Sequence, residues 1–123
     1  MRLQLTLPPS KNALHVRTIF GIATSHKAKQ WTRLAVTEIL LQADTKELLR
    51  FTEWVRNNKL LVVSVKVFFP DSRRRDAHNC LEVLADAIQE ATGIDDSFYL
   101  MRVMLKEIDK DDPRVEVVIT KDE

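Results

Sequence analysis

Hydrophobic and polar residues alternate along residues 2–7 of the chain. This two-residue period is typical of a β-strand that buries one face. The prolines that follow, Pro8 and Pro9, end the pattern because proline cannot donate a hydrogen bond to a strand ladder. Residues 11–25 show no clear period, so we expect them to form a loop over one end of a sheet.

Between residues 25 and 58 the hydrophobic residues recur at three- and four-residue spacing, which is the period of an amphipathic helix. Ser25 and Asp44 are suited to cap the starts of two helical segments. The pattern therefore predicts either a helical hairpin or one long, kinked helix. Within it, Trp31 and Trp54 are expected to anchor the core rather than to stack on nucleic-acid bases.

Three later segments favour strands, at residues 60–69, 98–108 and 115–120. The first is rich in Val and Phe and is long enough for a central strand. A helix that begins at Asp76 or Ala77 separates the first strand from the second. It is expected to end at Gly93, since glycine readily adopts the left-handed conformation that terminates helices.

The predicted order is strand, helix or helices, strand, helix, strand, strand. Such alternation predicts an α/β or α+β fold in which helices cover a mixed four-stranded sheet. The chain has 123 residues, and we expect one domain over residues 1–123. The last two strands are joined by acidic residues 109–113, which we interpret as a solvated turn rather than a metal site.

The composition is that of an ordinary folded protein, with 45% hydrophobic and 30% charged residues. No hydrophobic run approaches the roughly 20 residues of a membrane span, and the first residues resemble no signal peptide. The single cysteine, Cys80, excludes an internal disulfide, and we expect it to be a small buried side chain. These features predict a cytoplasmic protein without a membrane association.

Charge is unevenly distributed, although the formal net charge is only +1. Six basic residues precede the first acidic one, Glu38, and acidic residues gather near the C-terminus. Together with residues 73–75, the basic N-terminal third could form one positive surface for a polyanion. A solvated basic face is an equally open interpretation.

Residues 73–79 carry the strongest chemical signal, because three arginines run directly into an acid, a histidine and an amide. Further acids follow at Asp86 and at the pair Asp95–Asp96. Oxygen ligands beside arginine suit a divalent metal that acts on a phosphodiester, since arginine binds phosphate while carboxylates hold the ion. The segment therefore indicates a metal-dependent nuclease site.

The spacing of the polar residues supports a shared site. His78, Glu82 and Asp86 are separated by four residues each, so one helix would present them along one face. Asp76 stands where a strand and a basic turn meet a helix N-terminus, which favours anions. The pair Asp95–Asp96 precedes the next strand and could return to the site if that strand pairs beside the strand at residues 60–69.

Each of these residues also has an ordinary structural interpretation. Asp76 could be a helix cap, His78 a surface residue, and Asp95–Asp96 a turn. Glu82 and Asp86 could be solvated helix charges. From spacing alone, the composite metal site and these interpretations are about equally supported.

Several motifs along the chain form a recognisable set: Leu7-Pro8-Pro9-Ser10-Lys11-Asn12, Phe69-Pro70-Asp71-Ser72-Arg73-Arg74-Arg75-Asp76-Ala77-His78-Asn79-Cys80-Leu81, Asp86-Ala87 and Gly93-Ile94-Asp95-Asp96-Ser97. Together they resemble the RusA family of Holliday-junction resolvases, which phages and prophages often encode. The resemblance covers nearly the whole chain in one register, with an enlarged helical segment around residues 44–58.

This resemblance implies a small homodimeric endonuclease that cuts four-way DNA junctions with Mg²⁺, or with Mn²⁺. The essential carboxylates of the family would correspond to Asp76 and Asp96. Two positions depart from the family pattern, since His78 replaces an acid and Glu82 replaces a lysine. A neutral imidazole can still bind such a metal, whereas the loss of a cation at Glu82 removes a charge that could stabilise the phosphate.

We therefore expect Asp76, His78 and Asp96 to be the catalytic metal ligands, with Asp86 and Glu82 as further ligands. Contacts to the DNA are expected from Lys11, Asn12, Arg73, Arg74, Arg75 and Asn79. The main alternative is a RusA-like module that binds branched DNA but has lost catalysis through His78 and Glu82. A nuclease without junction specificity and a protein-interaction domain are weaker alternatives.

Overall fold

A computed structural model of the chain describes residues 1–9, 15–18, 21–24, 26–73 and 75–123. Four strands form its main sheet, in the spatial order β1 (Arg2–Thr6), β6 (Arg114–Lys121), β4 (Leu61–Phe69) and β5 (Tyr99–Ile108). Strand β6 is antiparallel to both β1 and β4, whereas β4 and β5 are parallel. The predicted mixed four-stranded sheet and α+β fold are confirmed.

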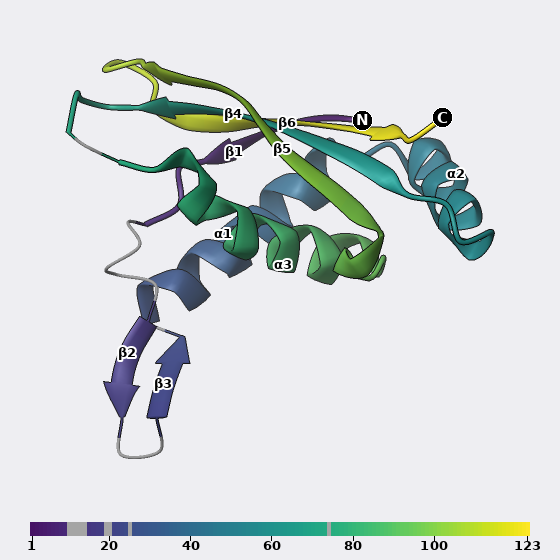
Figure 1. Ribbon diagram of the computed structural model, residues 1–123, viewed down its shortest axis with the longest axis horizontal. Coiled ribbons are helices and arrows are strands. Elements are labelled where there is room, and N and C mark those ends of the chain that lie inside the picture. The colour runs from purple at the N-terminus through teal and green to yellow at the C-terminus, as the bar shows by residue number, and fades with distance from the viewer. Residues whose placement is uncertain (10–14, 19–20, 25, 74) are drawn as a thin grey trace.

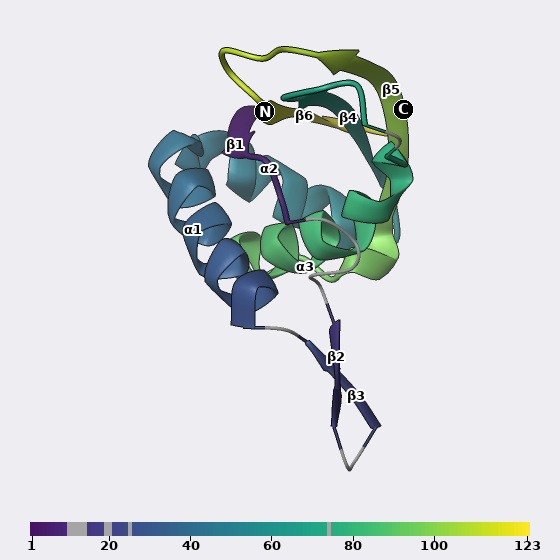
Figure 2. The same cartoon turned by 90° about the vertical axis from the view of Figure 1, so that its left-hand side faces the viewer.

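Two helices, α1 (His26–Gln42) and α3 (Leu81–Thr92), cover one face of the sheet (Figures 1 and 2). The core lies between this face and the helices. Strand β4 is an inner strand of the sheet, and alternate residues along it from Leu61 to Val67 are buried. The largest fully buried side chains come from all these layers and include Leu5, Ile39, Leu61, Val63, Val65, Val67, Leu84, Ile88, Val115 and Val117. This packing fixes the position of α3, which carries Glu82 and Asp86 of the candidate site and lies between the turns that carry the others.

The helical region at residues 26–56 contains two separate helices, α1 and α2 (Thr45–Arg56). Helix α2 turns away from α1 and lies at one end of the sheet (Figure 1). The predicted cap at Asp44 is confirmed, since its side chain accepts a hydrogen bond from the Lys46 backbone N–H at 3.0 Å. The predicted cap at Ser25 lies outside the described residues.

Both tryptophans serve the core, as predicted. Trp31 is only 5% exposed, and its indole N–H donates to the Thr6 carbonyl at 2.8 Å. Trp54 packs against the edge of the core and donates to the Leu60 carbonyl at 2.7 Å. A buried indole needs such a partner for its N–H, and the two bonds tie α1 to β1 and α2 to β4.

The expectation of an unstructured loop at residues 11–25 is wrong for part of that segment. Strands β2 (His15–Thr18) and β3 (Gly21–Thr24) pair with each other as an antiparallel hairpin. This hairpin projects away from the helices and the main sheet (Figures 1 and 2). The hairpin pairs outside the main sheet, and residues 11–25 have no clear period in the sequence by which it could have been predicted.

Candidate active site

The turn after β4 is held together by Asp71. Its side chain accepts a hydrogen bond from the Arg73 backbone N–H at 3.0 Å, and its Oδ1 lies 2.8 Å from Nη1 of Arg75. The guanidinium of Arg75 also stands over the Phe69 ring, 5.1 Å from its centroid. The hydrogen bonds from Arg73 and Arg75 lower the pKa of Asp71. The ionised carboxylate thus holds together the turn that leads to Asp76.

Asp76 and His78 form one small polar group directly after that turn. Asp76 Oδ1 accepts a hydrogen bond from the His78 backbone N–H at 2.9 Å and lies 3.3 Å from His78 Nδ1. These bonds, first the backbone one, lower the pKa of Asp76, and the charge of Lys106 contributes further. The side chains of Asp76 and His78 are 62% and 70% exposed, so an ionised carboxylate and an imidazole are both open to a ligand.

The helix begins later than the sequence predicted. Residues Ala77–Cys80 form a 3-10 turn, η2, capped by Asp76, and α3 starts only at Leu81. His78 therefore lies on η2, and the expected stripe of His78, Glu82 and Asp86 along one helix is wrong in its first member. Asp76 caps this turn, which is the structural role that the sequence offered as an alternative to metal binding. A capping carboxylate keeps a second oxygen that can still bind a metal ion or accept a hydrogen bond.

A second acidic group gathers along α3 and the turn that follows it. The pKa of Asp86 is raised, mainly by partial burial and then by the negative charges of Glu82 and Asp96. Asp96 lies in the 3-10 turn η3 (Asp96–Phe98), and its backbone N–H donates to Gln89 Oε1 at 2.8 Å. The negative charges of Glu82 and Asp96 thus act on Asp86 and disfavour its ionised form.

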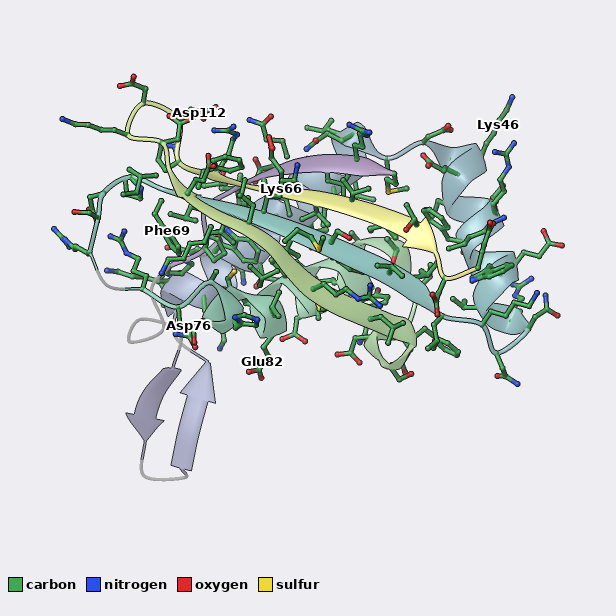
Figure 3. All side chains as sticks on the ribbon, turned by 45° about the horizontal axis from the view of Figure 1, so that its top comes forward. Lys46, Lys66, Phe69, Asp76, Glu82 and Asp112 are labelled. Atoms are coloured by element: carbon green, nitrogen blue, oxygen red, sulfur yellow. The ribbon has the colours of Figure 1, made fainter. Side chains whose placement is uncertain are left out.

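Asp76 and Asp96 lie beyond opposite ends of α3, whereas Glu82 stands in its first turn. Asp76 precedes the helix and Asp96 follows its C-cap, and the 12 residues of α3 span about 18 Å at 1.5 Å per residue. Figure 3 shows Asp76 before the helix and Glu82 further along it. Among the residues that the structure describes, no three His, Cys, Asp or Glu side chains are placed to hold one metal ion.

The direction of β5 explains this separation. The strand does pair beside β4, as the expected return of Asp95–Asp96 required, but the pairing is parallel. Tyr99 lies opposite Leu61 and Ile108 opposite Phe69. Asp96 therefore lies where β4 begins, whereas Asp76 follows the end of β4. The expected return of Asp96 to Asp76 does not occur within one chain.

The residues expected to contact DNA differ in how free they are. Both described arginines of the turn pair with Asp71: Arg73 is 80% exposed and its Nε lies 3.6 Å from Asp71 Oδ2, whereas Arg75 is only 24% exposed and its Nη1 lies 2.8 Å from Asp71 Oδ1. Asn79 is half-buried, and its backbone N–H donates to the Asp76 carbonyl at 3.2 Å. The structure does not describe Lys11, Asn12 and Arg74. Of this set, Arg73 is the described cation best placed to meet a phosphate.

Two further side chains complete the surroundings. Burial raises the pKa of Cys80 to about 11, so this thiol stays protonated; the side chain, expected to be buried, is partly buried. Lys106 of β5 donates through Nζ to the Arg75 carbonyl, next to Asp76. Sequence reasoning missed Lys106 because no motif contains it, and only the register of β5 against β4 brings it there.

A family model for Endodeoxyribonuclease RusA matches residues 6–120. The chain belongs to the RusA family. This match includes both acidic groups, the turn that carries Arg73 and Arg75, and strands β4 and β5 in full, with all but the last residue of β6. Membership of the RusA family places the chain among endonucleases that act on Holliday junctions. No curated protein sequence gives a significant match, and no helix in the described residues is long and apolar enough to cross a membrane.

Proposed function

We propose that this RusA-family protein is a divalent-metal-dependent endonuclease that cuts four-way DNA junctions by paired, symmetric nicks as a homodimer. The observation that carries the proposal is the exposed pair of Asp76 and His78, which directly follows the turn with Arg73 and Arg75. The RusA family model matches residues 6–120 around it. Carboxylate, imidazole and guanidinium groups together bind both a hard cation and a phosphate.

The donor types fit Mg²⁺ or Mn²⁺, but the donors of one chain do not complete a site. Asp76 and His78 supply one part before α3. Glu82 and Asp86 on α3, with Asp96 beyond its C-terminal end, supply another. We infer that these parts come together from two copies of the chain, because a two-fold axis brings the same two surfaces of each copy into contact twice. Such a dimer has two equivalent sites, which suits a two-fold-symmetric junction.

Each residue then has a defined role. Asp76, His78 and Asp96 would hold the ion, with Asp86 and Glu82 as further ligands, and the ion would supply charge neutralisation and a more acidic water. Arg73, with Arg74 and Arg75, Lys11, Asn12 and Asn79, would hold the DNA backbone. Contacts of this kind position the DNA without reading its sequence.

The direct test is cleavage of a labelled synthetic four-way junction in Mg²⁺ and in Mn²⁺, beside linear duplex of the same sequence. Wild-type protein is expected to nick two opposite strands symmetrically and to leave the duplex intact. Asp76→Asn and Asp96→Asn are each expected to lower the rate by about 100-fold or more, since each removes a metal ligand. Cleavage by Asp76→Asn at the wild-type rate would contradict the assignment.

A second candidate function is favoured by the charge at Glu82. This acid stands next to Asp86 and raises its pKa further, in a group where a phosphate would meet repulsion unless a cation is bound. A RusA-like module that binds junctions without cutting them would show tight binding in both metals and no nicks in either. The cleavage experiment therefore separates the two functions.

A further inference from the structure

Lys106 comes to the candidate active site from β5, far along the chain from the arginine turn. In the parallel ladder it lies opposite Val67, which is fully buried beneath the helices. Residues that face each other across two strands project from the same face of the sheet. The side chain of Lys106 therefore leaves the sheet on the helix side, where Arg75 and Asp76 lie.

One hydrogen bond holds the ammonium group there, and two longer-range interactions surround it. Its Nζ donates a hydrogen bond to the Arg75 carbonyl and lies 5.7 Å from the centroid of the Phe69 ring. Its positive charge also acts on the carboxylate of Asp76. A lysine ammonium has three N–H donors, so the bond to Arg75 leaves others for a ligand. The side chain is exposed, and those donors are open to an incoming phosphate.

Arg75 and Glu82, two neighbouring charged residues, are less suited to that task. The guanidinium of Arg75 is held by Asp71 through Nη1 at 2.8 Å and Nη2 at 3.3 Å, and it shares the Phe69 ring with Lys106. Glu82 is an acid and would repel a phosphate. Lys106 has no carboxylate within ion-pairing distance among the described residues, so its charge is not neutralised by a salt bridge.

We propose that Lys106 is a catalytic residue of this site, which contacts a non-bridging oxygen of the scissile phosphate beside Asp76. This inference rests on the proposed nuclease function. In hydrolysis the oxygen of water bonds to phosphorus while one ester bond breaks. The water gives up a proton and the departing alkoxide takes one up. Negative charge on the phosphate oxygens must be stabilised during that exchange, and a positioned ammonium does so without rearrangement.

The test compares Lys106→Met, Lys106→Arg and the control Lys66→Met in single-turnover cleavage and in junction binding. Lys106→Met keeps an unbranched apolar side chain but removes the charge, and its cleavage rate is expected to fall by about 100-fold or more, as when one preorganised donor is lost. Junction binding should weaken far less than cleavage. Lys106→Arg keeps a cation and is expected to recover most of the rate.

Lys66 is the matched control, because it is an exposed lysine on β4 between the buried residues Val65 and Val67. It therefore projects from the face that α1 and α3 leave open, and Lys66→Met should cut at the wild-type rate. Melting temperatures show whether each variant is folded. Equal cleavage losses in Lys106→Met and Lys106→Arg, with an equal fall in melting temperature, would assign Lys106 a structural role and overturn the proposal.

The proposal would also be overturned if Lys106→Met cut as fast as active wild-type protein, or if it lost binding and cleavage by the same factor. Failure of the nuclease function itself gives a different result. In that case wild-type protein leaves the junction intact in both metals, whatever stands at position 106.

Discussion

At the scale of single residues, two aspartates near α3 have opposite electrostatic settings. Hydrogen bonds from His78 lower the pKa of Asp76, whereas burial, Glu82 and Asp96 raise the pKa of Asp86. Asp76 is thus ionised at a low energetic cost, and ionised Asp86 destabilises the fold in the absence of a cation. Like charges held close together lower the stability of a fold but can bind a cation, and such groups are common at functional sites.

Asp86→Asn is therefore expected to raise the melting temperature at pH 7 by about 1–2 °C, which corresponds to the relief of one like-charge contact on a helix. The folded pKa of Asp86 lies above its ordinary value of 3.8. Its destabilising effect is thus absent below pH 3.8, where the carboxyl is protonated in both states, and it develops as the pH rises through the folded pKa. Thermal melts of both proteins, measured at about one-unit steps of pH between about 3 and 8, would follow this destabilisation.

A matched control for that measurement is Glu53→Gln, which neutralises an exposed acid on α2. It should not reproduce the pH-dependent gain of Asp86→Asn. A lower melting temperature for Asp86→Asn at pH 7 would show that the ionised carboxylate has a stabilising partner, which contradicts the electrostatic argument.

Metal binding by the proposed ligands should be visible without catalysis. A ligand that binds only the folded state raises the free energy of unfolding by about 2.7 kcal/mol when its concentration is about 100 times its dissociation constant. Wild-type protein is thus expected to melt several degrees higher in Mn²⁺, and a chelator should reverse the shift. Asp76→Asn should show little shift. The assignment of Asp76 as a ligand fails if its variant is stabilised as much as wild-type protein.

At the scale of secondary-structure elements, the sequence predicted what local chemistry decides. Strands β4, β5 and β6, the cap at Asp44 and the end of α3 lie within a residue or two of their predicted positions. The errors lie where tertiary contacts choose between local options. Residues Ala77–Cys80 form a 3-10 turn instead of the first helical turn, and the hairpin of β2 and β3 replaces an expected loop.

Gly93 ends α3 and leads the chain into the turn that carries Asp96. Its φ of 75° is the left-handed conformation of a helix C-cap, and its backbone N–H donates to the Gln89 carbonyl. Gly93→Ala should lower the free energy of unfolding by about 1 kcal/mol, or the melting temperature by about 4 °C, because L-residues with a Cβ rarely adopt that φ.

The cost is conformational and not steric, since a Cβ built at Gly93 would have no atom within 4 Å. Asparagine tolerates the left-handed region better than alanine does. Gly93→Asn should therefore lose less stability than Gly93→Ala when both are unfolded by urea. Equal losses in the two variants would argue against the backbone explanation.

At the scale of the whole molecule, the separation of the two acidic groups predicts a shared site. Asp76→Asn mixed with Asp96→Asn would form heterodimers in which one site carries both changes and the other carries neither. The mixture should recover nicking of one strand, although each variant alone is inactive. If both parts of the site came from one chain, every site in the mixture would be damaged and no nicks would appear.

Light scattering gives the control for that mixture, because the proposed dimer has twice the 14.2 kDa mass of one chain. Exposed leucines on α1 and α2 are candidates for its interface: Leu34, Leu40, Leu41 and Leu49. A monomer at the concentration of the cleavage assay, still active on junctions, would contradict the shared site.

The sequence by itself determined the types of element, the core pattern and the identity of the chemical groups. These follow from the period of hydrophobic residues and from side-chain chemistry, both of which are local along the chain. Only the tertiary structure decided which groups meet. The parallel pairing of β4 and β5 sends Asp96 to the far end of α3 and brings Lys106 to Asp76. Strand direction and register depend on contacts between distant segments, which no local pattern of residues records.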